Sequence, residues 1–104
     1  VSRQIVLINR GVAELRAPSP ETAYTTLSEV LANEELKIGA HYLAAGYYNL
    51  GLAARRTDRE AEAIRRFNEA IDTLPYSIYA RAARRALQER APEQEPQSTD
   101  AKPQ

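Results

Sequence analysis

Apolar residues recur every three or four positions along most of the chain, which is the spacing of an amphipathic helix. The first such stripe predicts a helix over residues 2–17, and its members are Ile5, Ile8, Val12 and Leu15. Ser19 and Pro20 are residue types that favour an N-cap and a first helical position, so we expect a second helix from here to about residue 33. The beginning of the chain therefore predicts two helices joined by a short turn.

The third stripe predicts a helix over residues 35–56, which is long for a globular protein. Gly39 and Gly46 lie within it, and no proline interrupts it. We expect the helix to bend, break or admit a close neighbour at these two glycines.

Two more helices follow. Thr57 and Glu60 have the spacing of a capping box, which predicts a helix from near residue 58 to residue 74, where Pro75 ends it. The last helix is expected over residues 77–90, with arginines outside and an inner side made of Ile78, Ala82, Ala83, Ala86 and Leu87.

A chain of 104 residues holds one small domain. The helical pattern predicts an all-α domain over residues 1–90, with about five helices. Residues 91–104 are rich in Pro and Gln and have no large apolar side chain, so we expect a disordered tail. Fourteen basic and fourteen acidic residues cancel, which disfavours nucleic acid as a partner. Direct membrane insertion is not expected, because no apolar run approaches the roughly 20 residues that span a bilayer.

The chain contains neither cysteine nor methionine. The lack of cysteine excludes disulfides, thiolate metal sites and cysteine nucleophiles, and it leaves both the cytoplasm and the periplasm open as compartments. Because the sequence begins at Val1, we also expect that an upstream segment, such as a signal peptide or a membrane anchor, has been removed.

The segment 44–75 has an aromatic residue, a Leu-Gly pair, two alanines, a phenylalanine and a proline at fixed spacing. These residues are Tyr47, Leu50, Gly51, Ala63, Phe67, Ala70 and Pro75. The pattern resembles the tetratricopeptide (TPR) repeat, a helical hairpin of about 34 residues. Ala54 and Asp58 depart from it, although aspartate tolerates the left-handed turn in which the family has glycine. The resemblance implies a short α-solenoid of antiparallel hairpins.

Small residues in such a hairpin allow its two helices to approach closely, and we expect Gly51 at the crossing with Phe67 filling the remaining space. The same template placed 40 residues earlier puts Gly11, Ala23 and Leu27 on the equivalent sites, which indicates a degenerate first repeat. The helix after residue 77 has arginines in place of the Leu-Gly pair and resembles the cap helix that ends such arrays.

The TPR family binds an extended peptide or a partner helix in a concave groove. The resemblance implies that this groove is faced by Tyr48, Asn49, Leu52, Arg55 and Arg56. The amide of Asn49 could donate to and accept from a peptide backbone, or it could simply face solvent. The complete set of residues with which chaperone-binding members hold a terminal carboxylate is not visible, so we do not predict chaperone-tail binding.

A basic patch is predicted on the last helix, at Arg81, Arg84 and Arg85. With Arg90 and Glu89 they give residues 76–90 a net charge of +3. The patch could bind an acidic partner, an anionic lipid head group or RNA, or it could be the solvated outer face of a cap helix. Nucleic acid is the least favoured of these, because the chain has no RNA-binding motif.

No catalytic constellation is recognisable. His41 is the single histidine, and no carboxylates lie near it at the spacing of metal ligands. The hydroxyl groups have no accompanying base, and there is no glycine-rich phosphate loop. We therefore predict no metal, no cofactor and no enzymatic activity.

The leading hypothesis is a non-catalytic adaptor or scaffold that binds a partner protein in the groove. The alternative is an accessory or assembly subunit that uses its whole helical surface to hold together a larger complex, including a membrane-associated one. Self-association also remains open, because a short stack exposes apolar end surface unless the cap helix covers it.

Overall fold

The computed structural model describes residues 3–16, 19–33 and 37–89, and these residues contain helices and no strand. The five helices are α1 (Arg3–Arg16), α2 (Pro20–Leu31), α3 (Ala40–Arg56), α4 (Glu60–Thr73) and α5 (Ile78–Gln88). The predicted all-α fold is confirmed. The tail expected over residues 91–104 lies outside the described residues.

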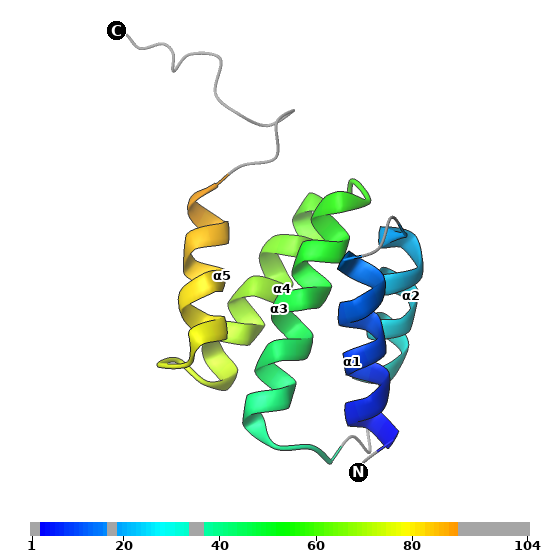
Figure 1. The fold of residues 1–104 in the computed structure, drawn as a ribbon. Coiled ribbons are helices and arrows are strands. Elements are labelled where there is room, and N and C mark those ends of the chain that lie inside the picture. The colour runs from blue at the N-terminus through cyan, green and yellow to red at the C-terminus, as the bar shows by residue number, and fades with distance from the viewer. Residues whose placement is uncertain (1–2, 17–18, 34–36, 90–104) are drawn as a thin grey trace, which may run out of the picture.

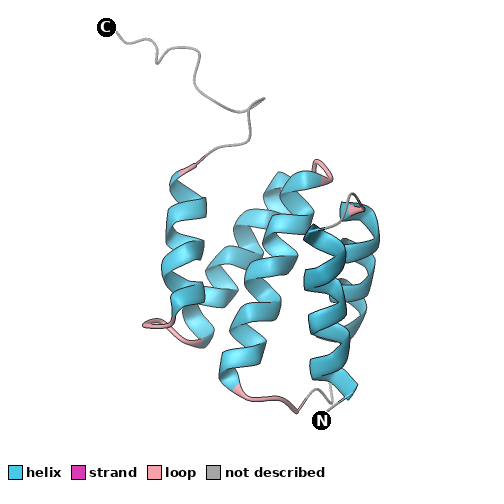
Figure 2. Ribbon diagram, viewed as in Figure 1, coloured by secondary structure: helices cyan, strands magenta, loops and turns pink. Residues whose placement is uncertain are grey.

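The helices are arranged in two layers. α1, α3 and α5 lie side by side in one layer, and α2 and α4 lie behind them (Figures 1 and 2). Each helix packs against the next one in the sequence, and α3 contacts all four of the others. α3 is therefore the centre of the fold.

The hairpin of α3 and α4 packs as its small residues predict. A Cβ atom added to Gly51 would lie only 2.6 Å from Cε1 of Phe67, so the ring lies directly on the α3 backbone. Phe67, Ala63 and Ala70 are fully buried. Asp58 adopts a positive φ of 63° between the two helices, which is the expected left-handed turn.

The hairpin of α1 and α2 repeats this contact. A Cβ atom added to Gly11 would lie 2.6 Å from Cγ of Leu27, and Leu27 and Ala23 are fully buried. The contact stands 40 residues before that of Gly51 with Phe67, as the shifted template predicts. Both hairpins thus place an apolar side chain of the second helix against a glycine of the first.

The predicted start of α3 is wrong. Residues 37–39 are not helical, α3 begins at Ala40, and Gly39 is its N-cap with extended backbone angles (φ −66°, ψ 156°). Glycine is among the poorest helix formers, and Gly39 lacks the close packing that surrounds Gly46 and Gly51 inside α3, because a Cβ added to it would meet no atom within 4 Å. The chain therefore breaks at one of the two glycines where a break was considered.

The predicted capping box is also wrong. The hydroxyl of Thr57 donates to the Ala53 carbonyl at 2.8 Å, and α4 begins at Glu60 after Arg59. The carboxylate of Glu60 pairs with Arg55 instead. Ser19 stands at the expected N-cap position before Pro20, but its side chain makes no capping hydrogen bond. Ser77, the expected start of the last helix, is the N-cap of α5, and its hydroxyl accepts from the backbone N–H of Ala80 at 3.0 Å.

None of the helices in the described ranges has both the length and the apolar character needed to cross a membrane.

Candidate binding groove

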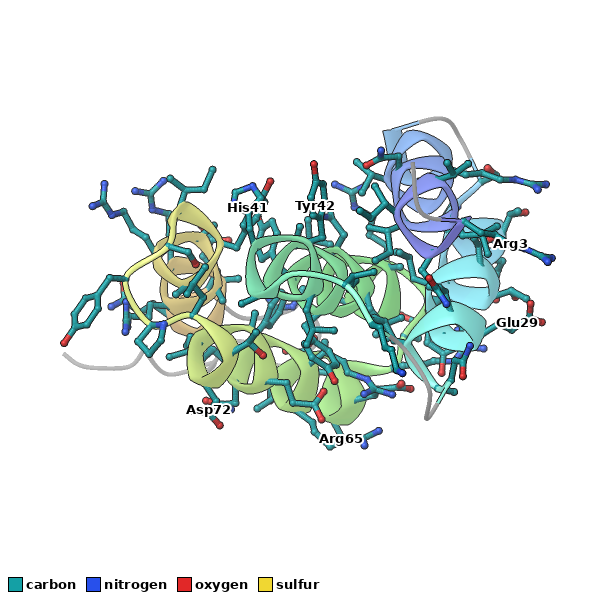
Figure 3. The ribbon with its side chains drawn as sticks, turned by 90° about the horizontal axis from the view of Figure 1, so that it is seen from below. Arg3, Glu29, His41, Tyr42, Arg65 and Asp72 are labelled. Carbon is teal, nitrogen blue, oxygen red and sulfur yellow. The ribbon has the colours of Figure 1, made fainter. Side chains whose placement is uncertain are left out.

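A groove of about 470 Å³ lies over the layer of α1, α3 and α5. Three helices contribute its lining, which consists of Ile8, Asn9, Val12, Tyr42, Ala45, Tyr48, Asn49 and Tyr79. Figure 3 views the helices from one end: Tyr42 and His41 point to the groove side, and Arg65 and Asp72 of α4 point to the opposite side. The groove therefore lies on the face that α2 and α4 leave uncovered.

One tyrosine ring of the groove, that of Tyr48, rests on the core. Tyr48 lies with its ring centroid 5.9 Å from that of the buried Phe67 and 6.3 Å from that of Tyr79. Burial, and secondarily the charge of Glu89, raise the pKa of the Tyr48 hydroxyl. At neutral pH this hydroxyl is protonated and can donate a hydrogen bond.

His41 lies at the edge of this aromatic group and is exposed. Its ring meets those of Tyr79 and Tyr42 edge-on, with centroids 5.2 Å and 5.6 Å away. His41 therefore connects the aromatic side chains of α3 and α5 on the groove side.

Two asparagines line the groove at equivalent positions of the two hairpins, Asn9 in α1 and Asn49 in α3. One N–H of Asn49 donates to the Ala45 carbonyl at 2.8 Å, while its other N–H and its oxygen make no hydrogen bond to the described residues. Asn9 is absent from the sequence-based site prediction. It could have been found, because it stands 40 residues before Asn49, the same separation as Gly11 and Gly51.

Arg55, which was expected to face the groove, is used inside the fold. Its Nε and Nη2 donate to the two carboxylate oxygens of Glu60 at 2.9 and 2.6 Å, and Nη1 donates to the Ala86 carbonyl at 2.8 Å. The guanidinium also lies 5.1 Å from the centroid of the Phe67 ring. The hydrogen bonds to Glu60 raise the pKa of Arg55. This side chain thus joins α3, the start of α4 and the end of α5.

The other predicted groove residues are divided. Tyr48 and Asn49 line the groove, whereas Leu52 is not in its lining and packs partly buried against the core. Arg56 is exposed at the end of α3. Its charge and that of Arg85 act to lower the pKa of the Tyr48 hydroxyl, but burial outweighs them. Binding of a partner by these five residues stays a prediction.

The opposite layer holds the two hairpins together. The hydroxyl of Tyr24 in α2 donates to Glu62 of α4 at 2.5 Å, and the guanidinium of Arg59 lies 3.9 Å from the Tyr24 ring centroid. Burial acts to raise the pKa of Glu62, but the hydrogen bond from Tyr24 and the charges of Arg66 and Arg65 outweigh it and lower that pKa. These side chains link α2 to α4, while α1 and α2 pack directly on α3.

A second hollow of about 470 Å³ lies between α1 and α2. Its lining includes Arg3, Arg10 and Glu29 and has no aromatic ring. Only one hairpin forms it, and Arg3 and Glu29 point outward at that end of the molecule (Figure 3). We regard the groove over three helices as the better candidate, because its rings and amides converge on one face.

The predicted basic residues Arg81, Arg84 and Arg85 are all exposed on α5. Arg81 and Arg85 lie on the side of the helix away from the buried Ala83, and Arg84 lies beside them, one turn after Ala80. The prediction that Ile78 belongs to the inner side is wrong, because its side chain is 65% exposed. The groove lining does not include them.

Within the described ranges, no group of three His, Cys, Asp or Glu side chains could hold a metal ion. No known protein family, curated protein or solved structure matches this chain. The resemblance to the TPR repeat therefore stays a prediction that depends on the residues and their packing.

Proposed function

We propose that this chain is a non-catalytic protein-interaction module, and that the groove over α1, α3 and α5 binds an extended peptide or a helix of a partner protein. One observation carries the proposal: three tyrosine rings and two side-chain amides line the same groove. Aromatic rings provide a large contact area with few rotamers, and amides can pair with a peptide backbone. Binding sites typically combine such apolar surface with a few polar groups.

The chemistry of the lining defines the kind of segment that fits. None of the eight lining side chains is charged at neutral pH. We therefore expect the bound segment to place apolar or neutral side chains against Tyr42, Ala45 and Tyr48. Its backbone or amide side chains would pair with Asn9 and Asn49.

The groove is also held in shape before a partner arrives. Tyr48 rests on Phe67, and Phe67 lies against Gly51, so the ring is fixed from below. A preformed site lowers the entropic cost of binding. The repeated glycine contacts of the two hairpins support the same proposal, because TPR-like hairpins stack to form such a groove.

A selection experiment tests this function. A displayed library containing random extended peptides and helix-length segments is selected against the wild-type chain. The affinity of the selected sequences is then measured by fluorescence anisotropy. Tyr42→Ser and Asn49→Ala should each weaken binding by about tenfold, the effect of losing one central contact. Circular dichroism verifies that every variant is folded.

The matched control is Ile64→Ser. Ile64 and Tyr42 are both 41% exposed, but Ile64 belongs to α4 in the other layer, so the control removes similar apolar surface away from the groove. Its affinity should equal that of the wild type. Selected segments that bind the groove variants and the wild type equally well would refute the proposal.

The second candidate function is that of an accessory subunit in a larger assembly. It is favoured by exposed apolar residues outside the groove: Tyr76 is 97% exposed and Ile78 is 65% exposed. Under this alternative, substitutions on the outer surface of α5 weaken association and groove substitutions do not.

A further inference from the structure

Helix α5 has two faces of contrasting chemistry. Its inner face packs on α4 and α3 through the buried Ala80, Ala83 and Ala86. Its outer face has no neighbouring helix in the described part of the chain, because α5 lies at one end of the row of α1, α3 and α5 (Figure 1). We call this outer surface the arginine face, and it consists of Ile78, Arg81, Arg84 and Arg85, all of them exposed.

The arginines of this face differ from those of the preceding hairpin in their partners. Four arginines of that hairpin have a carboxylate oxygen within 3.8 Å, namely Arg55, Arg59, Arg65 and Arg66. By contrast, no ion pair joins Arg81, Arg84 or Arg85 to a carboxylate of residues 3–16, 19–33 and 37–89. The arginine face therefore keeps a net positive charge, which Glu89, the one acidic residue among residues 76–89, offsets only in part.

Apolar surface adjoins these charges. Ile78 precedes Arg81 by three positions and Arg85 by seven, so the three side chains share one stripe of α5. Ile78 is 65% exposed, and Tyr76 in the preceding turn is 97% exposed. Aromatic residues together with arginine are enriched in protein interfaces. A bare polyanion would leave Ile78 and Tyr76 without a partner.

Charge also argues against a second copy of this chain as the occupant. In a two-fold dimer through α5, each arginine face would meet an identical one, and the like charges would repel. We propose that the arginine face binds an acidic, amphipathic helical segment of another protein. Its carboxylates pair with Arg81, Arg84 and Arg85, and its apolar side chains cover Ile78 and Tyr76. This surface is distinct from the groove, whose lining is uncharged.

The probes for the test are fluorescein-labelled amphipathic helical peptides. They carry glutamates on one face in several registers and leucines beside them, and matched peptides have glutamine in place of every glutamate. Anisotropy measures their affinity for the full chain at low and high salt. The acidic peptides should bind more tightly than the glutamine peptides. High salt should weaken the binding of the acidic peptides, because exposed charges are screened.

Substitutions then localise the binding. The triple variant Arg81→Gln, Arg84→Gln, Arg85→Gln should weaken the acidic peptides by about tenfold, the sum of three exposed ion pairs. The matched control Arg3→Gln, Lys37→Gln, Arg65→Gln removes the same charge from exposed sites outside α5 and should have less than about a twofold effect. Ile78→Ser should weaken binding by about fivefold, because the apolar contact is lost.

Four results would overturn the proposal. They are absence of binding by every acidic peptide, equal weakening by the control triple, an unchanged affinity in Ile78→Ser, and tighter arginine-dependent binding to RNA or to phosphatidylserine vesicles. Sedimentation gives a fifth: a wild-type dimer that the α5 triple variant abolishes would assign the face to self-association instead. Circular dichroism of each variant shows that the changes act on binding and not on folding.

Discussion

Replacing Gly51 with alanine should destabilise the protein, although alanine is the better helix former. An added Cβ would lie 2.6 Å from Cε1 and 2.7 Å from Cδ1 of Phe67. The ring cannot easily move away, because Phe67 is fully buried in one cluster with Ala63 and Ala70. α3 and α4 would have to separate, or the ring would have to leave its preferred rotamer.

The expected size follows from two opposing effects. Alanine in place of glycine stabilises a helix interior by about 1 kcal/mol. Overpacking a well-filled core costs about 1–3 kcal/mol, and a rigid ring at this distance belongs near the upper end. The free energy of unfolding of Gly51→Ala should therefore fall by about 1–2 kcal/mol.

Two other helical glycines provide the controls, because their replacement gains the same helix propensity. At Gly46 the nearest atom is Cδ2 of Leu31, 3.2 Å from an added Cβ, and this flexible end can shift. Gly46→Ala should be neutral or stabilising. At Gly11 the neighbour is Cγ of Leu27 at 2.6 Å, so Gly11→Ala should be destabilising, but less than Gly51→Ala because leucine can change rotamer more easily than a buried ring.

Urea denaturation followed by circular dichroism measures all three variants. The expected order of stability is Gly46→Ala, then Gly11→Ala, then Gly51→Ala. A Gly51→Ala variant as stable as Gly46→Ala would show that Phe67 does not press on α3, and the reasoning about the hairpin crossing would be wrong.

Three further predictions concern the polar contacts and one helix cap. Arg55→Met and Glu60→Gln should each lower the free energy of unfolding by about 2 kcal/mol, because each leaves a partner without its ion pair and the two side chains are only 16% and 8% exposed. If the double variant loses the sum of the two single losses, the two residues are not coupled and this reasoning is wrong. Because the fold lowers the pKa of Glu62 from its ordinary value of 4.5, the stabilising contribution of this carboxylate is present above that pH and is lost as the pH falls through the lower folded value. Tyr24→Phe should therefore make the free energy of unfolding depend less steeply on pH between neutral and acidic pH. If the dependence is unchanged, the hydrogen bond from Tyr24 to Glu62 is not its cause. Gly39→Asp should raise the free energy of unfolding by a few tenths of a kcal/mol, because aspartate caps a helix better and a Cβ there meets no atom within 4 Å.

The packing of each hairpin could be predicted from local spacing, whereas the start of α3 and the cap of α4 could not. Glycine with an apolar residue 16 positions later is a pattern within one hairpin, and both Gly11 with Leu27 and Gly51 with Phe67 follow it. The capping box failed because the carboxylate of Glu60 has a stronger partner in Arg55, a bidentate guanidinium. Spacing alone does not show this competition.

The site was predicted in part for the same reason. Tyr48 and Asn49 were named from the repeat pattern, whereas Asn9 was missed, although shifting the pattern by 40 residues would have found it. Arg55 was misplaced because its partner, the Ala86 carbonyl, is 31 residues further along the chain. The two meet only because α5 packs beside α3. Tyr79 enters the groove for that reason too. Contacts that depend on the path of the whole chain are not visible in the sequence.

The two proposed surfaces share α5, and its attachment to the rest of the fold links them. The inner face of α5 consists mainly of alanines, which bury little apolar area, so the hydrogen bond from Arg55 to the Ala86 carbonyl contributes much of the attachment of its end. Arg55→Met should therefore weaken peptide binding both in the groove, where Tyr79 contributes, and on the arginine face. The triple variant of Arg81 and its neighbours should weaken only the latter. If Arg55→Met leaves both affinities unchanged in a folded variant, α5 is held without this bond and the two surfaces are independent.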